Sequence, residues 1–339
     1  MPTDKPKVLF MSGPEYAKDV WNEFIQDFTV LLWEEQSRED FIRDLSSKYD
    51  GIQAIYRAAN PKYPHYKLGS FDREIVSAFP SSMKIFVNGA VGYNDVAVDV
   101  LSEKGILFCN TASGSDNATA DTALWLILST YKNTWQSEQS VRAGVWRDRT
   151  NVVGRDPAGD TVGILGLGNI GKAIAVRCKA IGMKVQYHNR NRIDAAEEEK
   201  YGVTYKTFDE LLSSSDTIVV AVPLTSDTKH ILNAESFKKV KRGVIIVNIS
   251  RGGCVDESAL VDAIKAGKVS KVGLDVFEEE PKIHPDLLSN EKHALLPHIG
   301  GATVNTFYNF EAIGMQNIKM WLKEGKAKTP INLSAIQKQ

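Results

Sequence analysis

The sequence predicts an α/β protein of two domains, each built on a doubly wound parallel sheet. Three observations support this prediction. The first hundred or so residues alternate short apolar runs with helical patterns, which is typical of a parallel sheet. A Gly-x-Gly-x-x-Gly pattern within residues 161–175 then joins a strand-like run to a helical pattern. The chain also has 339 residues, enough to bury two hydrophobic cores.

The first domain is expected to contain five strands. Each strand-like run is short and apolar, and the five lie at residues 8–11, 29–32, 52–56, 84–88 and 106–110. Helical patterns lie between them, for example at residues 17–28 and 40–49. The alternation implies a parallel sheet covered by helices.

The pattern changes near Asn117, where a domain crossing is expected. A long apolar helix is predicted over residues 118–131, and residues 142–160 are irregular, with three glycines and a proline. The last helix is predicted over residues 303–323, and its position suggests a return to the first domain.

The second domain lies between the crossing and this last helix. It has six strand-like runs, the number that a full doubly wound sheet needs, at residues 162–165, 184–188, 217–222, 244–249, 272–277 and 294–296.

The glycine pattern is the centre of the second domain. A strand-like run leads directly into Gly166, Gly168 and Gly171, and a helical pattern follows. Gly166 permits a tight turn, Gly168 lets the backbone approach a pyrophosphate, and Gly171 lets helix and strand pack closely. Amide groups at a helix start bind phosphates. The context therefore predicts a dinucleotide site, and a glycine-rich turn without a ligand is the alternative.

Charge and composition argue against several classes of partner. The formal net charge of −1 argues against nucleic-acid and anionic-membrane surfaces. No apolar run is long enough to span a bilayer, and the first residues lack the apolar core of a signal peptide. Three widely spaced cysteines indicate buried, reduced thiols in a cytoplasmic protein: Cys109, Cys178 and Cys254. The sequence has no metal-ligand motif, so no metal site is expected.

Three polar residues follow late strands of the second domain: Arg251, Glu280 and His298. Ligands of such sheets bind outside the carboxyl ends of the strands. A guanidinium clamps a carboxylate, an imidazolium donates a proton to a ketone oxygen, and a carboxylate beside it holds the imidazole tautomer. These residue types suit hydride chemistry on a 2-oxo acid. The alternatives are that residues 278–280 form a solvated acidic run and that Arg251 caps a turn. The other histidines share no spacing and are expected to be ordinary: His65, His188, His230, His284 and His293.

The motifs resemble the D-isomer-specific 2-hydroxyacid dehydrogenase family over essentially the full length of the chain. The chain is most similar to fungal members of the glyoxylate reductase and D-mandelate dehydrogenase type. The matching stretches are Gly-Leu-Gly-Asn-Ile-Gly (166–171), Asn-Ile-Ser-Arg-Gly-Gly (248–253), Gly-Leu-Asp-Val-Phe-Glu-Glu-Glu-Pro (273–281), Pro-His-Ile-Gly-Gly (297–301), Asn-Gly-Ala-Val-Gly-Tyr-Asn-Asp (88–95) and Asn-Ala-Thr-Ala-Asp-Thr-Ala-Leu (117–124).

The resemblance implies two domains, Rossmann-like and flavodoxin-like, with the active site in the cleft between them. The substrate domain is then discontinuous, over residues 1–117 and 304–339, and residues 118–303 form the NAD(P)-binding Rossmann domain. The family also implies a homodimer built largely through the cofactor domain.

The resemblance also implies roles for individual residues. Arg251 matches the substrate-binding arginine, His298 the acid/base and Glu280 its carboxylate partner. The backbone amides of Val91 and Gly92 match those that bind the substrate carboxylate. The implied cofactor contacts, with Asp275 on the nicotinamide carboxamide, are Gly166, Gly168, Asn169, Ile170, Gly171, Asn189, Arg190, Arg192, Val222, Pro223, Ile249, Ser250, Arg251, Asp275, His298, Gly300 and Gly301.

One departure from the family concerns the choice of cofactor. Members that use NAD usually carry an acidic residue at the end of the second Rossmann strand, where this chain has Asn189. Arg190 and Arg192 follow, and an arginine there can bind a 2′-phosphate. The sequence therefore predicts that NADP is preferred and that NAD is a second cofactor. The alternative is that both arginines are surface charges and the site accepts NADP and NAD alike.

Together these features predict NADPH-preferring reduction of 2-oxo acids to D-2-hydroxy acids, with the proton from His298 and the hydride from nicotinamide C4. Phe307 or Tyr308 in the last helix, and a loop at 144–149 with Trp146 but no second tryptophan, indicate a pocket open to branched or aromatic side chains. One alternative is a glyoxylate/hydroxypyruvate reductase. Another, from a different class, is a dinucleotide-binding corepressor of the C-terminal binding protein type, which retains the same polar residues but recruits proteins.

Overall fold

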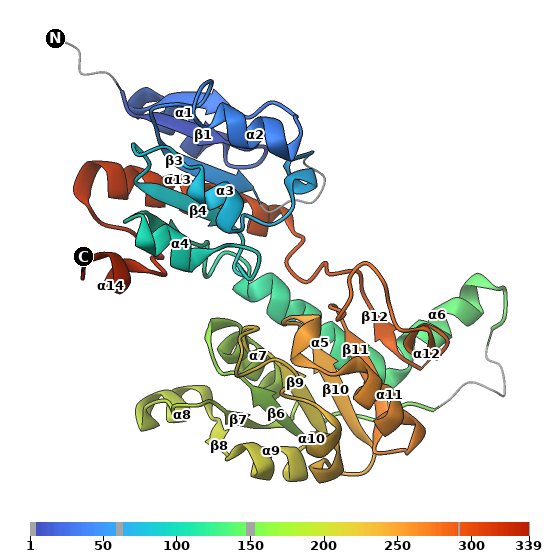
Figure 1. The fold of residues 1–339 in the computed structure, drawn as a ribbon. Helices are drawn as coiled ribbons and strands as arrows, with labels where there is room; N and C mark the ends of the chain where they lie inside the picture. The colour runs from blue at the N-terminus through green and yellow to red at the C-terminus, as the bar shows by residue number, and fades with distance from the viewer. Residues whose placement is uncertain (1–4, 59–63, 147–152, 291, 339) are drawn as a thin grey trace. The chain divides into compact units, whose positions relative to one another are not determined.

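The computed structural model describes residues 5–58, 64–146, 153–290 and 292–338. The chain forms two compact units (Figure 1): the first comprises Met1–Ser115 and Ala302–Gln339, and the second Asp116–Gly301. The chain leaves the first unit once and returns to it through its longest helix, α13 (Val304–Glu324). The predicted α/β fold with two parallel sheets is confirmed.

Among the described residues, the sheet of the first unit has five parallel strands. Their order is β2-β1-β3-β4-β5, the flavodoxin-like order of a doubly wound sheet. The three central strands are mostly buried on both faces, which explains why each reads as an apolar run. The five predicted strands are all present, as β1 (Lys7–Phe10), β2 (Thr29–Leu32), β3 (Ile52–Ala58), β4 (Ile85–Gly89) and β5 (Leu107–Cys109).

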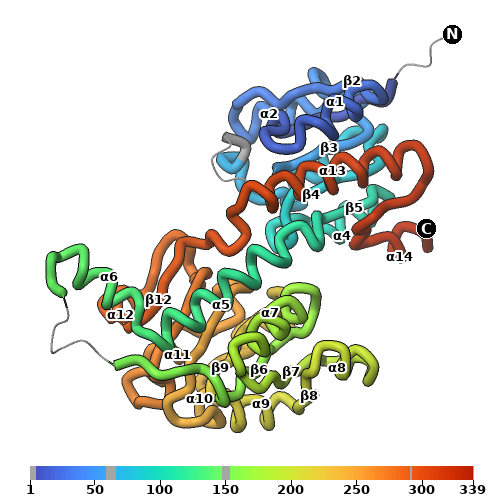
Figure 2. The backbone as a smooth tube through the Cα atoms, turned by 180° about the vertical axis from the view of Figure 1, so that it is seen from behind, coloured from blue at the N-terminus to red at the C-terminus, as the bar shows by residue number. Residues whose placement is uncertain are grey.

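Alternate residues of each strand in this unit pack against helices on opposite faces of the sheet. Val8 and Phe10 share a core with α1 and α13, whereas Leu9 belongs to the core formed with α2, α3 and α4. Figure 2 shows α13 running along this sheet. The helices of the first unit are α1 (Lys18–Asp27), α2 (Arg38–Asp44), the 3₁₀ helix η1 (Pro64–Leu68), α3 (Arg73–Ser77), α4 (Val98–Glu103), α13 and α14 (Leu333–Ile336).

The described part of the second unit has a sheet of seven parallel strands in the order β12-β11-β10-β9-β6-β7-β8. Numbered from β6, this is the Rossmann order 3-2-1-4-5-6 with one further strand at the edge. The prediction of six strands missed β8, because two residues are too short for a periodic pattern. The strands are β6 (Thr161–Leu165), β7 (Lys184–His188), β8 (Thr204–Tyr205), β9 (Thr217–Val220), β10 (Val244–Asn248), β11 (Val269–Leu274) and β12 (Ala294–Leu295).

Helices cover both faces of this second sheet. α5 (Asp116–Lys132) and α7 (Asn169–Ala180) lie side by side on one face (Figure 2), and α9, α10 and α11 form the core of the other. No helix in the described ranges is long and apolar enough to cross a membrane. The remaining helices of this unit are α6 (Thr134–Arg142), α8 (Ala195–Tyr201), α9 (Phe208–Ser214), α10 (Ala234–Lys239), the 3₁₀ helix η2 (Gly252–Cys254), α11 (Glu257–Lys265) and α12 (Pro285–Leu288).

The strand order of the second unit reverses at β6. This strand lies between β7 and β9, and the sheet continues outward from both. Ligands of doubly wound sheets bind outside the carboxyl ends of the strands at such a point, because the connections there leave toward opposite faces. The turn after β6 is therefore the place where the fold predicts a ligand.

Candidate active site

The turn between β6 and α7 requires glycine at two positions for reasons within the protein itself. Gly166 has a φ of +99°, and a Cβ there would lie 2.7 Å from the carbonyl oxygen of Ala221, just past β9. A Cβ at Gly171 would lie 2.2 Å from the carbonyl oxygen of Gly166. Because carbon atoms do not approach oxygen this closely, the turn, β9 and α7 pack together only when both residues are glycine.

Gly168 differs, because nothing in the described protein requires glycine there. It is the N-cap of α7 with a φ of −78°, and an added Cβ would meet no described atom within 4 Å. The first amide groups of an α-helix have no intrahelical partner, and the first turn of α7 carries no acidic residue. Open space beside the start of a helix fits the pyrophosphate of a dinucleotide.

The polar residues after β7 lie next to this turn. Asn189 Oδ1 accepts a hydrogen bond of 2.6 Å from the Leu167 amide, so Asn189 is attached to the glycine turn itself. The Arg190 side chain is 86% exposed, and its guanidinium lies 3.8 Å from the exposed Asp227 carboxylate. Because this ion pair is loose and solvated, Arg190 can leave Asp227 for another anion at little cost in free energy.

Arg192, in contrast, is already bound within the protein. Its guanidinium donates to both carboxylate oxygens of Glu198, over 2.8 and 2.7 Å. These bonds, with one from the Tyr187 hydroxyl, hold the pKa of Glu198 at about 2. Of the two arginines predicted at this end of β7, Arg190 is therefore the more available for a bound anion.

Three adjacent strands bring the predicted catalytic residues to one edge of the second sheet. Arg251, Glu280 and His298 follow the carboxyl ends of β10, β11 and β12. His298 Nδ1 lies 2.9 Å from Glu280 Oε2, and Glu280 Oε1 accepts a hydrogen bond of 3.0 Å from the Phe277 amide. The carboxylate thus favours the tautomer with the proton on Nδ1 and leaves Nε2 to exchange a proton with a ligand.

Glu280 is an anion at neutral pH. Burial alone would raise the pKa of its carboxyl, but hydrogen bonds from His298 and from the Phe277 amide, with the charge of Arg251, lower that pKa below its usual value. All three glutamates at 278–280 are exposed, as a solvated acidic run would be, but the last one also has fixed hydrogen-bond partners. Its carboxylate accepts hydrogen bonds from the His298 ring and from the Phe277 amide, and the charge of Arg251 lies nearby.

A second carboxylate, Asp275, shapes the loop that carries His298. Asp275 is 2% exposed, and its two oxygens accept hydrogen bonds of 2.8 Å each from the amides of Ile299 and Gly300. Burial raises the pKa of its carboxyl. The Asp275 carbonyl oxygen accepts a further bond of 2.7 Å from the His298 amide. These bonds hold His298 in the left-handed region, with a φ of +55°.

The turn that carries Arg251 is clamped by a residue that the sequence analysis missed. Asn248, the last residue of β10, is 1% exposed. Its amide nitrogen donates to the Arg251 carbonyl oxygen over 3.0 Å, and its Oδ1 accepts from the Ser250 amide over 3.1 Å. Arg251 Nη1 in turn donates to the Ser250 carbonyl oxygen over 2.7 Å, which restrains the guanidinium.

The predicted carboxylate-binding loop of the first unit is held in the same way. Asn110 Nδ2 donates to the Val91 carbonyl oxygen over 2.9 Å, and Asn88 Nδ2 donates to the Gly92 carbonyl oxygen over 3.0 Å. Neither the Val91 nor the Gly92 amide has a hydrogen bond within the described residues. The carbonyl groups of this loop are hydrogen-bonded, while these two amides can still donate, which suits an anionic ligand.

The three asparagines that hold these turns share a position that can be recognised in the sequence. Each stands at or directly after the end of an apolar run, at Asn88, Asn110 and Asn248. A short amide at that place can donate to and accept from the backbone of the turn that follows. The other predicted cofactor residues lie at the start of α7 or after β9, β10 and β12, and their contacts with a cofactor stay predictions: Asn169, Ile170, Val222, Pro223, Ile249, Ser250, Gly300 and Gly301.

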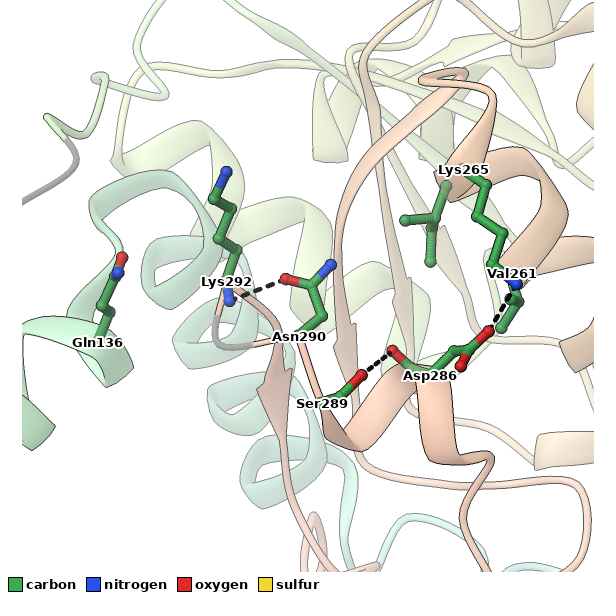
Figure 3. Close-up of a pocket in the computed structure, with 8 residues that line it drawn as sticks. Gln136, Val261, Lys265, Asp286, Ser289, Asn290 and Lys292 are labelled. Carbon is green, nitrogen blue, oxygen red and sulfur yellow. Dashed lines mark hydrogen bonds and ion pairs between the residues drawn. The ribbon is translucent and has the colours of Figure 1, made fainter.

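A pocket elsewhere in the second unit has no part in this cluster (Figure 3). It has a volume of about 630 Å³ and contains an ion pair of 2.7 Å between Lys265 and Asp286. None of its lining residues belongs to the glycine turn or to the strand ends described above. In the described part of the chain, no group of three or more His, Cys, Asp or Glu side chains is placed to bind a metal ion.

The comparisons with known proteins agree with this geometry. The family profile described as "D-isomer specific 2-hydroxyacid dehydrogenase, NAD binding domain" matches residues 124–300. The chain belongs to the D-isomer specific 2-hydroxyacid dehydrogenase family. It is 38% identical over 326 residues to 4-methyl-2-oxopentanoate reductase A of Aspergillus oryzae, covering 96% of this chain and 97% of that protein.

Two solved structures of the family extend over nearly the whole chain. A glyoxylate reductase from Paecilomyes thermophila matches with a TM-score of 0.90 at 38% identity, over 98% of this chain and 99% of that one. The holo form of Rhodotorula graminis D-mandelate dehydrogenase matches with a TM-score of 0.91 at 32% identity, over 97% and 98%. The chain is therefore an NAD(P)-dependent 2-hydroxyacid dehydrogenase, and its relatives reduce 2-oxo acids.

Proposed function

We propose that the chain reduces 2-oxo acids to D-2-hydroxy acids and prefers NADPH. The observation that carries the proposal is the His298–Glu280 pair of 2.9 Å beside Arg251, on three adjacent strand ends. Reduced nicotinamide, when bound, supplies the hydride for the carbonyl carbon. His298 gives its Nε2 proton to the carbonyl oxygen, so that hydride and proton together convert the carbonyl to a hydroxyl, and Glu280 stabilises the imidazolium before the transfer.

Binding of the substrate is assigned to two sets of groups. The Arg251 guanidinium holds the carboxylate and the carbonyl oxygen in one plane, which suits its fork of donors. The amides of Val91 and Gly92 bind the substrate carboxylate, and Asp275 accepts a hydrogen bond from the nicotinamide carboxamide. The hydrogen bonds made by Asn248 and Asn88 keep the two binding turns in place before the ligand arrives.

We further propose that branched or aromatic 2-oxo acids are the better substrates. The names of the Aspergillus oryzae and Rhodotorula graminis relatives refer to a branched 2-oxo acid and to an aromatic hydroxy acid. In this chain, Phe307 of α13 stacks on Tyr16 with ring centroids 5.3 Å apart, which makes an aromatic surface. Tyr308 instead donates its hydroxyl to Asp19 over 2.8 Å. An apolar side chain that covers Phe307 gains roughly 25 cal/mol per Å² of buried surface.

The second candidate is a glyoxylate/hydroxypyruvate reductase. It is favoured by the Paecilomyes thermophila enzyme, a glyoxylate reductase at 38% identity. Trp146, in the loop at 144–149, is 77% exposed, and residues 147–149 of that loop lie outside the described residues. Relative kcat/KM values for glyoxylate and for bulky 2-oxo acids decide between the two candidates.

The preference for NADPH rests on Asn189 and Arg190. Asn189 removes the negative charge that would repel a 2′-phosphate, and its hydrogen bond to the Leu167 amide keeps it beside the glycine turn. Arg190 is exposed and only loosely paired with Asp227. A charge-assisted hydrogen bond from its guanidinium to a 2′-phosphate would be stronger than that ion pair.

We also propose that the enzyme is a homodimer that uses the surface around α6. Four large apolar side chains are exposed there, which is unusual for a surface without a partner: Trp135 (46%), Val141 (58%), Val145 (42%) and Trp146 (77%). Sedimentation equilibrium of the purified chain should give twice the monomer mass, and Val141→Glu should shift it toward the monomer. A monomeric wild-type protein at micromolar concentration would contradict the proposal.

The cytoplasm is the compartment we propose for this activity. Cys109, Cys178 and Cys254 are buried and unpaired, and burial raises the pKa of the Cys109 and Cys178 thiols to about 12. Such thiols are inert in a reducing compartment. Fractionation of cells that express the full chain checks this assignment, and recovery in an organelle fraction would contradict it.

The test of the reaction is a substitution at His298. Asparagine, like histidine, tolerates the left-handed backbone, but it cannot serve as the proton donor. In His298→Asn, kcat should therefore fall by roughly two to four decades, while the Kd for NADPH stays the same. His284→Asn, at a half-buried histidine that caps α12, is the control and should retain wild-type kcat. A near wild-type kcat in His298→Asn would remove the mechanism. Absence of turnover in the wild type with every 2-oxo acid would instead favour the corepressor alternative.

A further inference from the structure

The structure contains a second histidine–carboxylate pair, whose carboxylate belongs to Glu278, two residues before Glu280 in the chain. His230 Nε2 donates to Glu278 Oε1 over 2.5 Å, while His298 Nδ1 donates to Glu280 Oε2 over 2.9 Å. His230 was expected to be an ordinary histidine, and the proposed reaction does not use it. The segment that carries Glu278 and Glu280 therefore forms a hydrogen bond with one imidazole at each of these two carboxylates.

Glu278 has a second partner, Glu257. Its amide donates to Glu257 Oε1 over 2.7 Å, and its Oε2 accepts from the Glu257 amide over 3.3 Å. Glu257 is 8% exposed, and burial raises the pKa of its carboxyl, to which the nearby charge of Glu278 contributes. Without His230, the Glu278 carboxylate would keep the bond from the Glu257 amide but would lose the bond from the imidazole, beside a second acidic side chain.

The backbone of His230 is attached to the other catalytic turn. Its amide donates to the Gly253 carbonyl oxygen over 2.9 Å, two residues after Arg251. The two turns are themselves in contact, because a Cβ at Gly252 would lie 1.9 Å from the Phe277 carbonyl group. His230 has a φ of +50°, in the left-handed region. Its bonds to the Gly253 carbonyl oxygen and to Glu278 are therefore made from a strained backbone conformation.

We propose that His230 is a positioning residue of the reaction, which acts through Glu278 on the orientation of Glu280 and hence of His298. The His230 backbone bond anchors the histidine to the turn of Arg251, and its side chain then fixes the turn of Glu280 relative to that anchor. The inference rests on the proposed function, because it takes Glu280 and His298 as the catalytic pair. His230 itself touches neither Glu280 nor His298 through any contact in the described residues.

The test compares two amide substitutions whose side chains differ in reach. Asparagine tolerates the left-handed backbone, but its amide nitrogen is one bond closer to Cβ than His Nε2, so His230→Asn loses the bond to Glu278. Glutamine places its amide nitrogen at the same number of bonds from Cβ, so His230→Gln can restore it. Lys229→Ala, at the exposed neighbour in the same loop, is the control.

We expect His230→Asn to lower kcat for a 2-oxo acid by about ten- to a hundredfold, the effect of misplacing a catalytic group, with less than about a twofold change in the KM for the oxo acid and in the Kd for NADPH. His230→Gln should recover most of the loss, and Lys229→Ala should match the wild type. In a Glu280→Gln background, His230→Asn should cost less than about twofold, since the two substitutions then disturb the same group.

Three outcomes would overturn the proposal. They are an unchanged kcat in His230→Asn, a loss that glutamine does not rescue, and equal losses in the Glu280→Gln and wild-type backgrounds. Failure of the proposed function is recognised separately, because the wild type itself would then reduce no 2-oxo acid.

Discussion

His298 is restrained at its backbone and at its ring by two different acidic residues, Asp275 and Glu280. The Asp275 carbonyl oxygen binds its amide, the Asp275 carboxylate binds the next two amides, and Glu280 binds Nδ1. A left-handed non-glycine residue costs of order 1 kcal/mol or more and persists only where its surroundings determine it. The strained backbone and the paired ring together leave Nε2 in one direction, which is the requirement for a proton donor of fixed position.

His293 gives a prediction for stability rather than catalysis. Its side chain is 3% exposed, its Nδ1 accepts from the Val272 amide over 3.3 Å, and burial lowers its pKa to about 4. In the unfolded chain the pKa is about 6.5, so between pH 6.5 and 4 the unfolded state binds a proton that the folded state does not. The free energy of unfolding should therefore fall by about 3 kcal/mol as the pH drops through this range.

Urea unfolding of the apoprotein at several pH values measures this effect. His293→Gln keeps an acceptor for the Val272 amide but cannot be protonated, so its stability should fall less steeply over the same range. Parallel curves for the wild type and His293→Gln would contradict the prediction.

We expect single residues to decide the choice of cofactor, and the two arginines after β7 make a matched pair for testing this. Arg190 is loosely paired, whereas Arg192 is held by two bonds to Glu198. Arg190→Ala should lower kcat/KM for NADPH by tens of fold, the loss of a charge-assisted contact, and leave NADH nearly unchanged. Arg192→Ala should change neither value by more than about twofold, because its guanidinium is already occupied. Equal losses for both cofactors in Arg190→Ala would mean that Arg190 does not bind the phosphate.

At the scale of elements, the β6–α7 turn separates glycines needed by the fold from the glycine needed by a ligand. A Cβ at Gly171 would meet the Gly166 carbonyl oxygen at 2.2 Å, so Gly171→Ala should destabilise the apoprotein by about 1–3 kcal/mol. Gly168→Ala meets no described atom and should cost less than about 1 kcal/mol, the difference in capping preference. The Kd for NADPH should nevertheless rise at least about tenfold in Gly168→Ala, because the Cβ enters the space assigned to the pyrophosphate.

Fluorescence titration with NADPH and urea unfolding distinguish the two glycine variants. An unchanged Kd in Gly168→Ala would place the pyrophosphate elsewhere. A stable Gly171→Ala would mean that the helix and strand can move apart.

The sequence was sufficient to predict the elements whose residues are buried on both faces. The runs at 85–87 and 244–247 are uninterrupted and apolar, and both belong to central strands. It was not sufficient for β8, which has two residues, or for the partners of Asn248 and His230. Those contacts join residues that are distant in the chain or lie in turns, and hydrophobic periodicity contains no information about either.

At the scale of the whole molecule, the two units have the same architecture but different strand orders. The first follows the flavodoxin-like order and the second the Rossmann order, and in each unit the predicted binding groups follow the carboxyl ends of strands. The glycine turn, Arg251, Glu280 and His298 all belong to the second unit, whereas the loop with Val91 and Gly92 belongs to the first. We therefore propose that the second unit binds the cofactor and carries the proton donor, and that the loop of the first unit contributes to substrate binding.

The most direct test of this account is the steady-state rate of NADPH oxidation with 4-methyl-2-oxopentanoate, phenylglyoxylate and glyoxylate as alternative substrates, with the configuration of each chiral product determined. The account predicts turnover with all three, the highest kcat/KM for one of the two bulky acids, and products of D configuration. A kcat/KM for glyoxylate at least about tenfold above both bulky acids would contradict the proposed substrate class. No turnover with any of the three, or products of L configuration, would contradict the central claim that this chain reduces 2-oxo acids to D-2-hydroxy acids.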